Sequence, residues 1–427
     1  MPKLKRELGL LESTVYGVGI ILGAGIYALI GQAAGVTGNS LWLSFAVGAV
    51  VASLTGLSYA ELATMIPKAA AEYTWLKKTG SKLLGFLVGW LMSFAGVAAA
   101  ATVALGFAGY FNGLFNMPIT LVAIGLVLIL SYINFRGIKD SSTFNIIFTG
   151  VEAIGLVIVI LLGLTVIGKT EINYLEMTNG IGGVLSAATL VFFAYIGFED
   201  IANIAEETKR PRRVLHKAFI ASILLTTVLY ILVSIATVSL ANTGELAASN
   251  APLALAVSKT FLGSNAFVVM SYIALFATAN TVLIIISVTA RMVYGMSVDG
   301  SLPKILARVH NSRKTPYTAI FLLTALSIIF ILFGNLNVAA HMANIIAFIA
   351  FGLVNASLIW LRFKYPKMKR PFKSPVNIGK FPVLAFLGLL TCIFMIFQFE
   401  LKIMLYTSIV LIAGMVVYYL MKRKVIA

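Results

Sequence analysis

The sequence predicts an all-α integral membrane protein with twelve transmembrane helices. Three observations support this: the composition, the lengths of the apolar segments, and the alternation of basic residues between loops. The chain has 427 residues, of which 60% are hydrophobic and only 11% are charged. A soluble domain usually carries roughly 25% charged residues. We therefore expect nearly the whole chain to form one membrane domain, residues 1–427.

Twelve apolar segments are each long enough to cross ~30 Å of hydrocarbon as a helix. Short turns divide the ninth from the tenth and the eleventh from the twelfth. The segments are 13–36, 40–66, 84–112, 118–135, 143–167, 182–206, 215–241, 265–298, 317–335, 338–362, 381–400 and 402–421.

The basic residues alternate in density from loop to loop. Of the 32 Lys and Arg residues, 28 fall on one set of alternate loops, and only Lys169, Lys259 and Lys402 fall on the other. Basic loops stay in the cytoplasm, so we expect a multi-pass protein of the cell membrane with both termini cytoplasmic. The net charge of +17 is thus explained by topology and contact with anionic lipids, and no nucleic acid is expected as a partner.

Residues for metal binding or catalysis are sparse. The only cysteine is Cys392, and the three histidines are dispersed along the chain. Metal sites built on Cys and His need clustered ligands, so neither a metal site nor another cofactor is expected. No nucleophile with a nearby base is evident either, and we therefore expect no enzyme activity.

The order of the segments suggests two repeats. Segments one to five (13–167) would form the first repeat, segments six to ten (182–362) the second, and 381–421 two trailing helices. A basic, proline-containing loop over 364–380 separates the trailing helices from the rest. Because each repeat has an odd number of spans, the second repeat must be inverted relative to the first.

The first segment of the first repeat is interrupted by Gly23-Ala24-Gly25. Free N–H groups at the start of the second half-helix suit a carboxylate. The carbonyl groups of Gly19, Ile20, Ile21 and Leu22, at the end of the first half, would face a cation. The alternative is close helix packing, because Gly19 and Gly23 are four residues apart.

The first segment of the second repeat is interrupted at the matching place, within 192–199. Phe193 could act as a lid beside this break, whereas the alternative is a ring that faces lipid. Glu199 follows the break, and an ionisable group at membrane depth is costly enough to indicate function. The alternative is a carboxylate that caps the broken helix.

Glycine-broken helices at matching places in two halves indicate the substrate site of a secondary transporter. A channel would usually carry rings of polar pore-lining residues, which the sequence lacks. A sensor would usually carry a soluble signalling domain, and no segment outside the membrane is long enough for one.

Several motifs resemble the amino acid–polyamine–organocation superfamily, particularly its cationic amino-acid-transporter-like branch. They are Gly17–Gly35, Tyr59-Ala60-Glu61-Leu62 with Glu72-Tyr73, Phe192–Glu199 with Glu206–Pro211, and Arg291–Pro303.

The resemblance implies a LeuT-type fold of five plus five inverted helices, with helices one and six discontinuous. It also implies an amino-acid substrate, with Phe193 as a gate and Glu199 near the coupling ion. The substrate site that it implies comprises Ile20, Ile21, Gly23, Ala24, Gly25, Phe192, Phe193, Ala194 and Ile196.

Glu152, in the fifth segment, departs from this resemblance. Relatives in the nearest branch often carry a buried lysine there, in place of a sodium ion. A buried carboxyl group without a counter-ion tends to be neutral. Glu152 could bind the coupling proton, ligate Na⁺ together with Asn280, Thr281 and the carbonyls of Gly19 and Leu22, or act as a permanently protonated donor.

We therefore predict a secondary active amino-acid transporter that works by alternating access with proton symport. The alternative is a Na⁺-coupled or uncoupled uniporter or exchanger of amino acids or polyamines.

Overall fold

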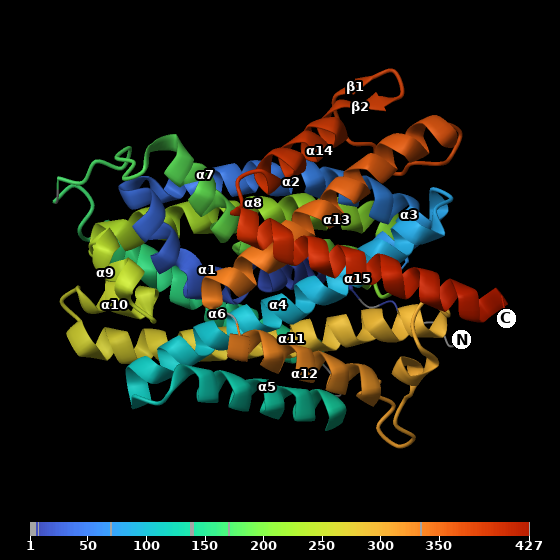
Figure 1. Ribbon diagram of the computed structural model, residues 1–427. Coiled ribbons are helices and arrows are strands. Elements are labelled where there is room, and N and C mark those ends of the chain that lie inside the picture. Colours follow the sequence, from blue (N-terminus) through green and yellow to red (C-terminus); the bar gives the residue numbers. More distant parts are fainter. Residues whose placement is uncertain are drawn as a thin grey trace.

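The computed structural model describes residues 6, 8–68, 71–136, 141–169, 171–333 and 335–426, without the side chains of 141–147, 333 and 423–426. Of the basic residues counted above, Lys3, Lys5 and Lys139 lie outside the described residues. The described chain is a bundle of long helices that run roughly along one direction (Figure 1). The predicted all-α class is confirmed.

The first half of the bundle contains six α-helices and one 3₁₀ turn. They are α1 (Leu10–Thr37), η1 (Gly38–Ser40), α2 (Leu41–Met65), α3 (Ala71–Lys78), α4 (Lys82–Phe115), α5 (Ile119–Arg136) and α6 (Ser141–Leu164).

The second half opens with a broken helix and contains two short helices between the long ones. The elements are α7 (Gly180–Val191), η2 (Phe192–Ala194), η3 (Phe198–Glu206), α8 (Pro211–Leu240), α9 (Thr243–Ala248), α10 (Pro252–Ser258), α11 (Gly263–Val298), η4 (Lys304–Ala307), α12 (Tyr317–Phe333) and α13 (Leu336–Lys364).

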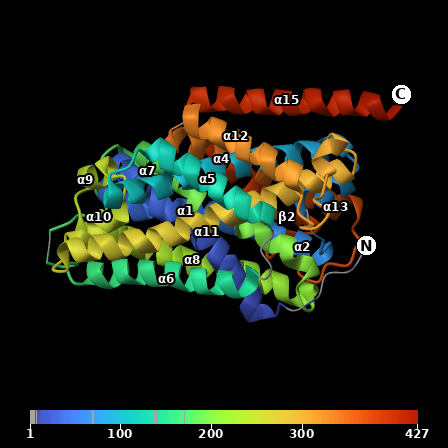
Figure 2. The same cartoon turned by 90° about the horizontal axis from the view of Figure 1, so that it is seen from below.

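A small hairpin and two further helices end the chain. They are β1 (Asn377–Ile378), β2 (Phe381–Pro382), α14 (Val383–Ile396) and α15 (Leu401–Ile426). The strands are antiparallel, with Ile378 opposite Phe381. In both views α15 lies along the outside of the bundle (Figures 1 and 2), where it contacts α4 and α13.

Local sequence explains several helix starts. The Ser81 hydroxyl accepts the N–H of Leu84 at 3.1 Å, which caps α4. The Asn335 side chain caps α13 in the same way. Proline opens α8 at Pro211, where the missing N–H costs nothing because the first N–H groups of a helix have no partner within the helix.

Among the described residues, eight segments are long and apolar enough to cross a membrane, and three shorter apolar helices accompany them. The first of the eight, Leu10–Met65, contains both α1 and α2. Neither α3 nor α9 and α10 was predicted, because each is short and carries no long apolar run.

Packing joins the two halves closely. Helix α2 packs on α8, α4 packs on α11 and α13, and α1 contacts α6, α7 and α8 near the centre. The pairs α2–α8 and α4–α11 each join equivalent positions of the two predicted repeats.

A buried ion cluster fixes the basic loop between α13 and α14. The Glu61 carboxylate on α2 is fully buried. It accepts hydrogen bonds from Arg362 Nε at 2.9 Å and from the Ser374 backbone N–H at 2.8 Å, and Arg370 Nε lies 3.3 Å away. Because buried charges need such partners, Glu61 has a structural role at the junction of α2, α13 and this loop.

Candidate functional site

The first predicted break is present in α1. Gly23 has φ 5° and ψ −165°, which is non-helical, and it divides α1 into two half-helices. Gly25 follows in the second half, and a Cβ atom there would lie only 2.5 Å from Ala194 Cα. Glycine is needed at position 25 because the second broken helix approaches it so closely.

The second predicted break is also present. The chain turns from η2 through Tyr195 and Ile196 to Gly197, whose φ of +118° favours glycine. A Cβ atom at Gly197 would lie 3.0 Å from the Ile20 carbonyl oxygen. The two breaks therefore touch each other at two places, Gly25 against Ala194 and Gly197 against Ile20.

Tyr230 of α8 links the two breaks. Its Oη lies 2.5 Å from the Ile21 carbonyl oxygen and 2.9 Å from that of Ala194, within donor distance of each. The side chain is fully buried. Since a phenol has one proton, it can satisfy only one of these acceptors at a time. This role could not be predicted from the sequence, because a single tyrosine in an apolar helix is also typical of a packed core.

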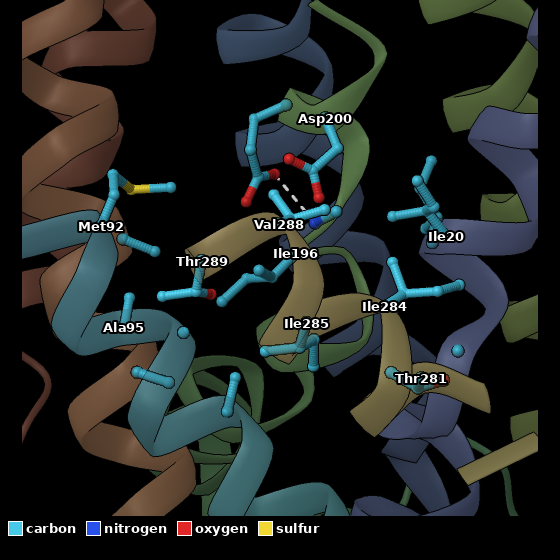
Figure 3. A pocket seen from close by; sticks show the side chains of 18 of the residues that line it. Ile20, Met92, Ala95, Ile196, Asp200, Thr281, Ile284, Ile285, Val288 and Thr289 are labelled. Atoms are coloured by element: carbon cyan, nitrogen blue, oxygen red, sulfur yellow. Dashed lines mark hydrogen bonds between the residues drawn. The ribbon is translucent and has the colours of Figure 1, made fainter. Parts of the chain in front are cut away.

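A cavity of about 110 Å³ lies beside the breaks. Figure 3 shows Ile285 on the side of α11 that faces Met92 and Ala95 of α4, and Ile284 on the side that faces Ile20 of α1. Asp200 lies at one end of the cavity (Figure 3). The site thus combines broken-helix backbone, an aliphatic wall and an acidic end.

Most of the residues predicted for the site line this cavity. They are Gly19, Ile20, Ile21, Gly23, Ala24, Gly25, Phe193, Ile196, Glu199 and Thr281.

Five predicted residues lie outside its lining: Leu22, Glu152, Phe192, Ala194 and Asn280. The 3₁₀ turn η2 rotates successive side chains by about 120°. Phe193 therefore faces the cavity, whereas the Phe192 ring packs on Phe348 of α13 with centroids 4.3 Å apart.

Glu152 of α6 is fully buried near the first break, and neither carboxylate oxygen has a hydrogen-bond partner among the described residues. The Asn280 side chain approaches this carboxyl group but does not meet the distance and angle of a hydrogen bond. The Tyr27 hydroxyl donates to the Glu152 backbone carbonyl at 2.7 Å. Thr149 lies one turn before Glu152 and packs against Gly19, just before the first break. A Cβ atom at position 19 would lie only 2.0 Å from Thr149 Oγ1.

The acidic end of the cavity contains three carboxyl groups. Glu199 Oε2 accepts the N–H of Gly197 at 2.8 Å, so Glu199 caps the second break while it lines the cavity. Asp200 follows, and Glu72 of α3 reaches the same end. Glu72 lies between α2 and α4, outside the membrane-spanning segments, and burial raises its pKa to about 7. Sequence analysis missed Glu72 as a site residue because it assigned no element to 71–78.

Other polar residues have structural partners. Asp299 pairs with Lys77 at 2.7 Å, and no ion pair joins it to Arg291 in the described part of the chain. Asn344 donates to the carbonyl groups of Thr189 and Leu190, which joins α13 to α7.

The fold and this site define an all-α, multi-pass membrane protein with a cavity between two broken helices. The chain belongs to the amino acid permease family, whose model matches residues 8–420.

Relatives in this family cover nearly the whole chain. The branched-chain amino acid permease BcaP of Bacillus subtilis is 32% identical over 99% of this chain and 94% of its own length. The methylthioribose transporter of the same organism is 29% identical with the same coverage. The human cystine/glutamate transporter is 30% identical over 92% of this chain and 80% of its own. The protein is therefore a transporter and not an enzyme.

Proposed function

We propose that this protein is a secondary active transporter of amino acids that works by alternating access. The observation that carries this proposal is the contact of two broken helices beside a cavity that both of them line. The free N–H groups of Gly23, Ala24 and Gly25 are placed to bind the substrate carboxylate. The Ile21 carbonyl group, which lines the cavity and lies within donor distance of the Tyr230 hydroxyl, is an acceptor for the substrate ammonium group.

The aliphatic wall favours an amino acid with an apolar side chain. Met92, Ile284, Ile285, Val288 and Met292 line that part of the cavity. Burial of apolar surface stabilises the complex by about 25 cal/mol per Å². The similarity to a branched-chain amino acid permease supports the same class of substrate.

The architecture in this proposal is a LeuT-type inverted repeat of twelve spans. Helices α1 and α7 to η3 are the discontinuous first helices of repeats 13–167 and 182–362, and 381–421 adds two. The basic loops support an orientation with both termini on the cytoplasmic side of the plasma membrane.

Glu152 is the proposed carrier of the coupling proton. A carboxyl group that is buried without a hydrogen-bond partner or counter-ion favours the protonated form. Its proximity to the first break would let proton release and substrate release influence each other. The hydroxyl groups of Thr149 and Thr281, which lie against Gly19 and Gly23, support the alternative of Na⁺ coupling at the same place.

The first test is thermal stabilisation of the purified protein by each amino acid and by common polyamines, at pH 5.5 and 7.5, with and without Na⁺. A ligand that binds only the folded state raises the unfolding temperature by mass action. We expect stabilisation by branched-chain amino acids. Stabilisation by no amino acid would contradict the proposed substrate class.

The coupling ion is tested by uptake into proteoliposomes. Wild-type protein should accumulate substrate under an inward proton gradient, and Glu152→Gln should exchange substrate without accumulating it. Glu171→Gln, at an exposed loop position, is the control and should behave as wild type. Accumulation that needs a Na⁺ gradient would assign Na⁺ coupling, and accumulation under neither gradient would assign uniport or exchange.

A further inference from the structure

We propose that Glu72, together with Glu199 and Asp200, forms a second binding site for an ammonium group, at the end of the cavity where α3 meets η3. This inference rests on the proposed transport of amino acids. The second site would lie between the broken helices and the side of the protein that carries α3. In the proposed orientation this is the cytoplasmic side.

Glu72 brings a buried carboxyl group to the cavity. Its side chain is 1% exposed and lines the cavity. Neither of its carboxylate oxygens meets the distance and angle of a hydrogen bond with a described residue, and the Tyr59 hydroxyl is the polar side-chain group that approaches it. A buried carboxyl group without a partner is costly, so a group that binds here gains more than it would at the surface.

The surrounding structure fixes Glu72 in place. The N–H of Ala71 donates to Asn203 Oδ1 at 3.2 Å, and Asn203 Nδ2 donates to Asp200 Oδ1 at 3.1 Å. These bonds attach the start of α3 to η3. The three carboxyl groups therefore converge through helix geometry and not through flexible side chains alone.

The charges around the cluster favour a cation. Glu72 interacts electrostatically with Asp200, and Glu199 with both. The Tyr59 hydroxyl faces Glu72 from α2. Arg291 is exposed, and both Arg291 and Asp200 interact electrostatically with Tyr16. None of the described residues that line the cavity is Lys, Arg or His. Three neighbouring carboxyl groups cannot all ionise unless a cation joins them.

Ammonium fits this arrangement better than a metal ion. In the described part of the chain, no group of three His, Cys, Asp or Glu residues is arranged to hold a metal ion. Metal ligands must converge to about 2.0–2.6 Å, whereas an ammonium group has three donors that reach acceptors at about 2.7–2.9 Å. A primary ammonium can therefore join carboxylates that are too far apart for one metal ion.

Two sources can supply this group. One is the α-ammonium of any amino acid as it leaves the carbonyl groups of the breaks. The other is the side-chain ammonium of a diamino acid whose α-groups remain at the breaks. Both require at least one ionised carboxylate, so binding should strengthen as the pH on the α3 side rises. The pKa of Glu72, raised to about 7 by burial, places this change between pH 6 and pH 8.

The test measures the KM for transport that starts from the α3 side, in oriented proteoliposomes with the opposite side held at constant pH. The substrates are leucine and ornithine, each at pH 6 and pH 8. Glu72→Gln should raise the KM about tenfold at pH 8, which corresponds to about 1.4 kcal/mol, and should change it little at pH 6. Glu72→Asp should retain the pH dependence, and Glu171→Gln is the matched control.

The outcomes separate the possibilities. An increase for both substrates identifies the α-ammonium, and an increase for ornithine alone identifies the side-chain ammonium. An unchanged KM at pH 8 for a folded Glu72→Gln protein overturns the inference and leaves amino-acid transport intact. Wild-type protein that transports no amino acid refutes the proposed function and this inference with it.

Discussion

The contact between the two breaks makes Gly25→Ala a sensitive perturbation. The new Cβ would lie 2.5 Å from Ala194 Cα and 2.9 Å from its backbone nitrogen. Carbon atoms in contact are usually about 3.5–4.0 Å apart, so the breaks must separate by about 1 Å. Both contacts are with backbone, and no side-chain rotation can relieve them.

The separation should disrupt carboxylate binding more than folding. A hydrogen bond to a charged group contributes about 1.5–3 kcal/mol, so the loss of one N–H contact should raise the Kd about 10- to 150-fold. Stability should change little in comparison, because alanine favours the helix by about 1 kcal/mol over glycine and offsets part of the clash.

The assay is equilibrium binding of the most stabilising amino acid to purified protein, alongside the unfolding temperature. The matched control is Gly125→Ala in α5, where a Cβ would meet no atom within 4 Å. It should keep the wild-type Kd. A folded Gly25→Ala protein that binds with the wild-type Kd would refute the carboxylate site assigned to this break.

Three further predictions concern stability. Tyr230→Phe should leave the carbonyl groups of Ile21 and Ala194 without a donor, lowering the unfolding free energy by about 1–3 kcal/mol; Tyr272→Phe, an exposed tyrosine of α11, should leave the unfolding temperature unchanged. Glu61→Gln should leave Arg362 buried beside an uncharged group and cost about 3–5 kcal/mol in denaturant unfolding, and a loss below 1 kcal/mol would contradict the structural role of Glu61. Burial raises the pKa of Glu72 from 4.5 to about 7, so the folded state binds the proton more tightly than the unfolded state does. The unfolding free energy of the wild-type protein should therefore fall by on the order of 3 kcal/mol as the pH rises from 4.5 to 7. Glu72→Gln should remove this part of the pH dependence, as thermal unfolding between pH 4.5 and pH 8 would show.

The helix breaks could be predicted because their signal is local. Gly23, Gly25 and Gly197 interrupt apolar runs, and such a pattern has few explanations in hydrocarbon. Glu152 was equally visible, because an isolated carboxyl group in an apolar segment is conspicuous. The all-α class followed from composition and segment length alone.

The acidic end of the cavity could not be predicted in the same way. Glu72 lies on a short helix with no long apolar run, and only the tertiary fold brings it to Asp200, more than a hundred residues later in the chain. The resemblance singled out Phe193 as the gate but also put Phe192 in the site, and the packing of Phe192 on Phe348 depends on the 3₁₀ geometry of η2. The Tyr230 hydroxyl lies within donor distance of two carbonyl groups from different helices. Contacts between residues so far apart in the chain cannot be predicted from sequence spacing.

Close contacts join the elements that form the cavity wall. Gly25 and Gly197 bring the two breaks together, and Tyr230 adds α8, so neither break can move without the other. Across the cavity, α4 and α11 are equally close, because a Cβ at Gly96 would lie 2.1 Å from Thr289 Oγ1. Closely packed interfaces resist gradual deformation. The cavity wall is just as close where α1 meets α4, because a Cβ at Gly106 would lie 2.6 Å from Ala28 Cβ, so any opening of the cavity must also shift α1 against α4.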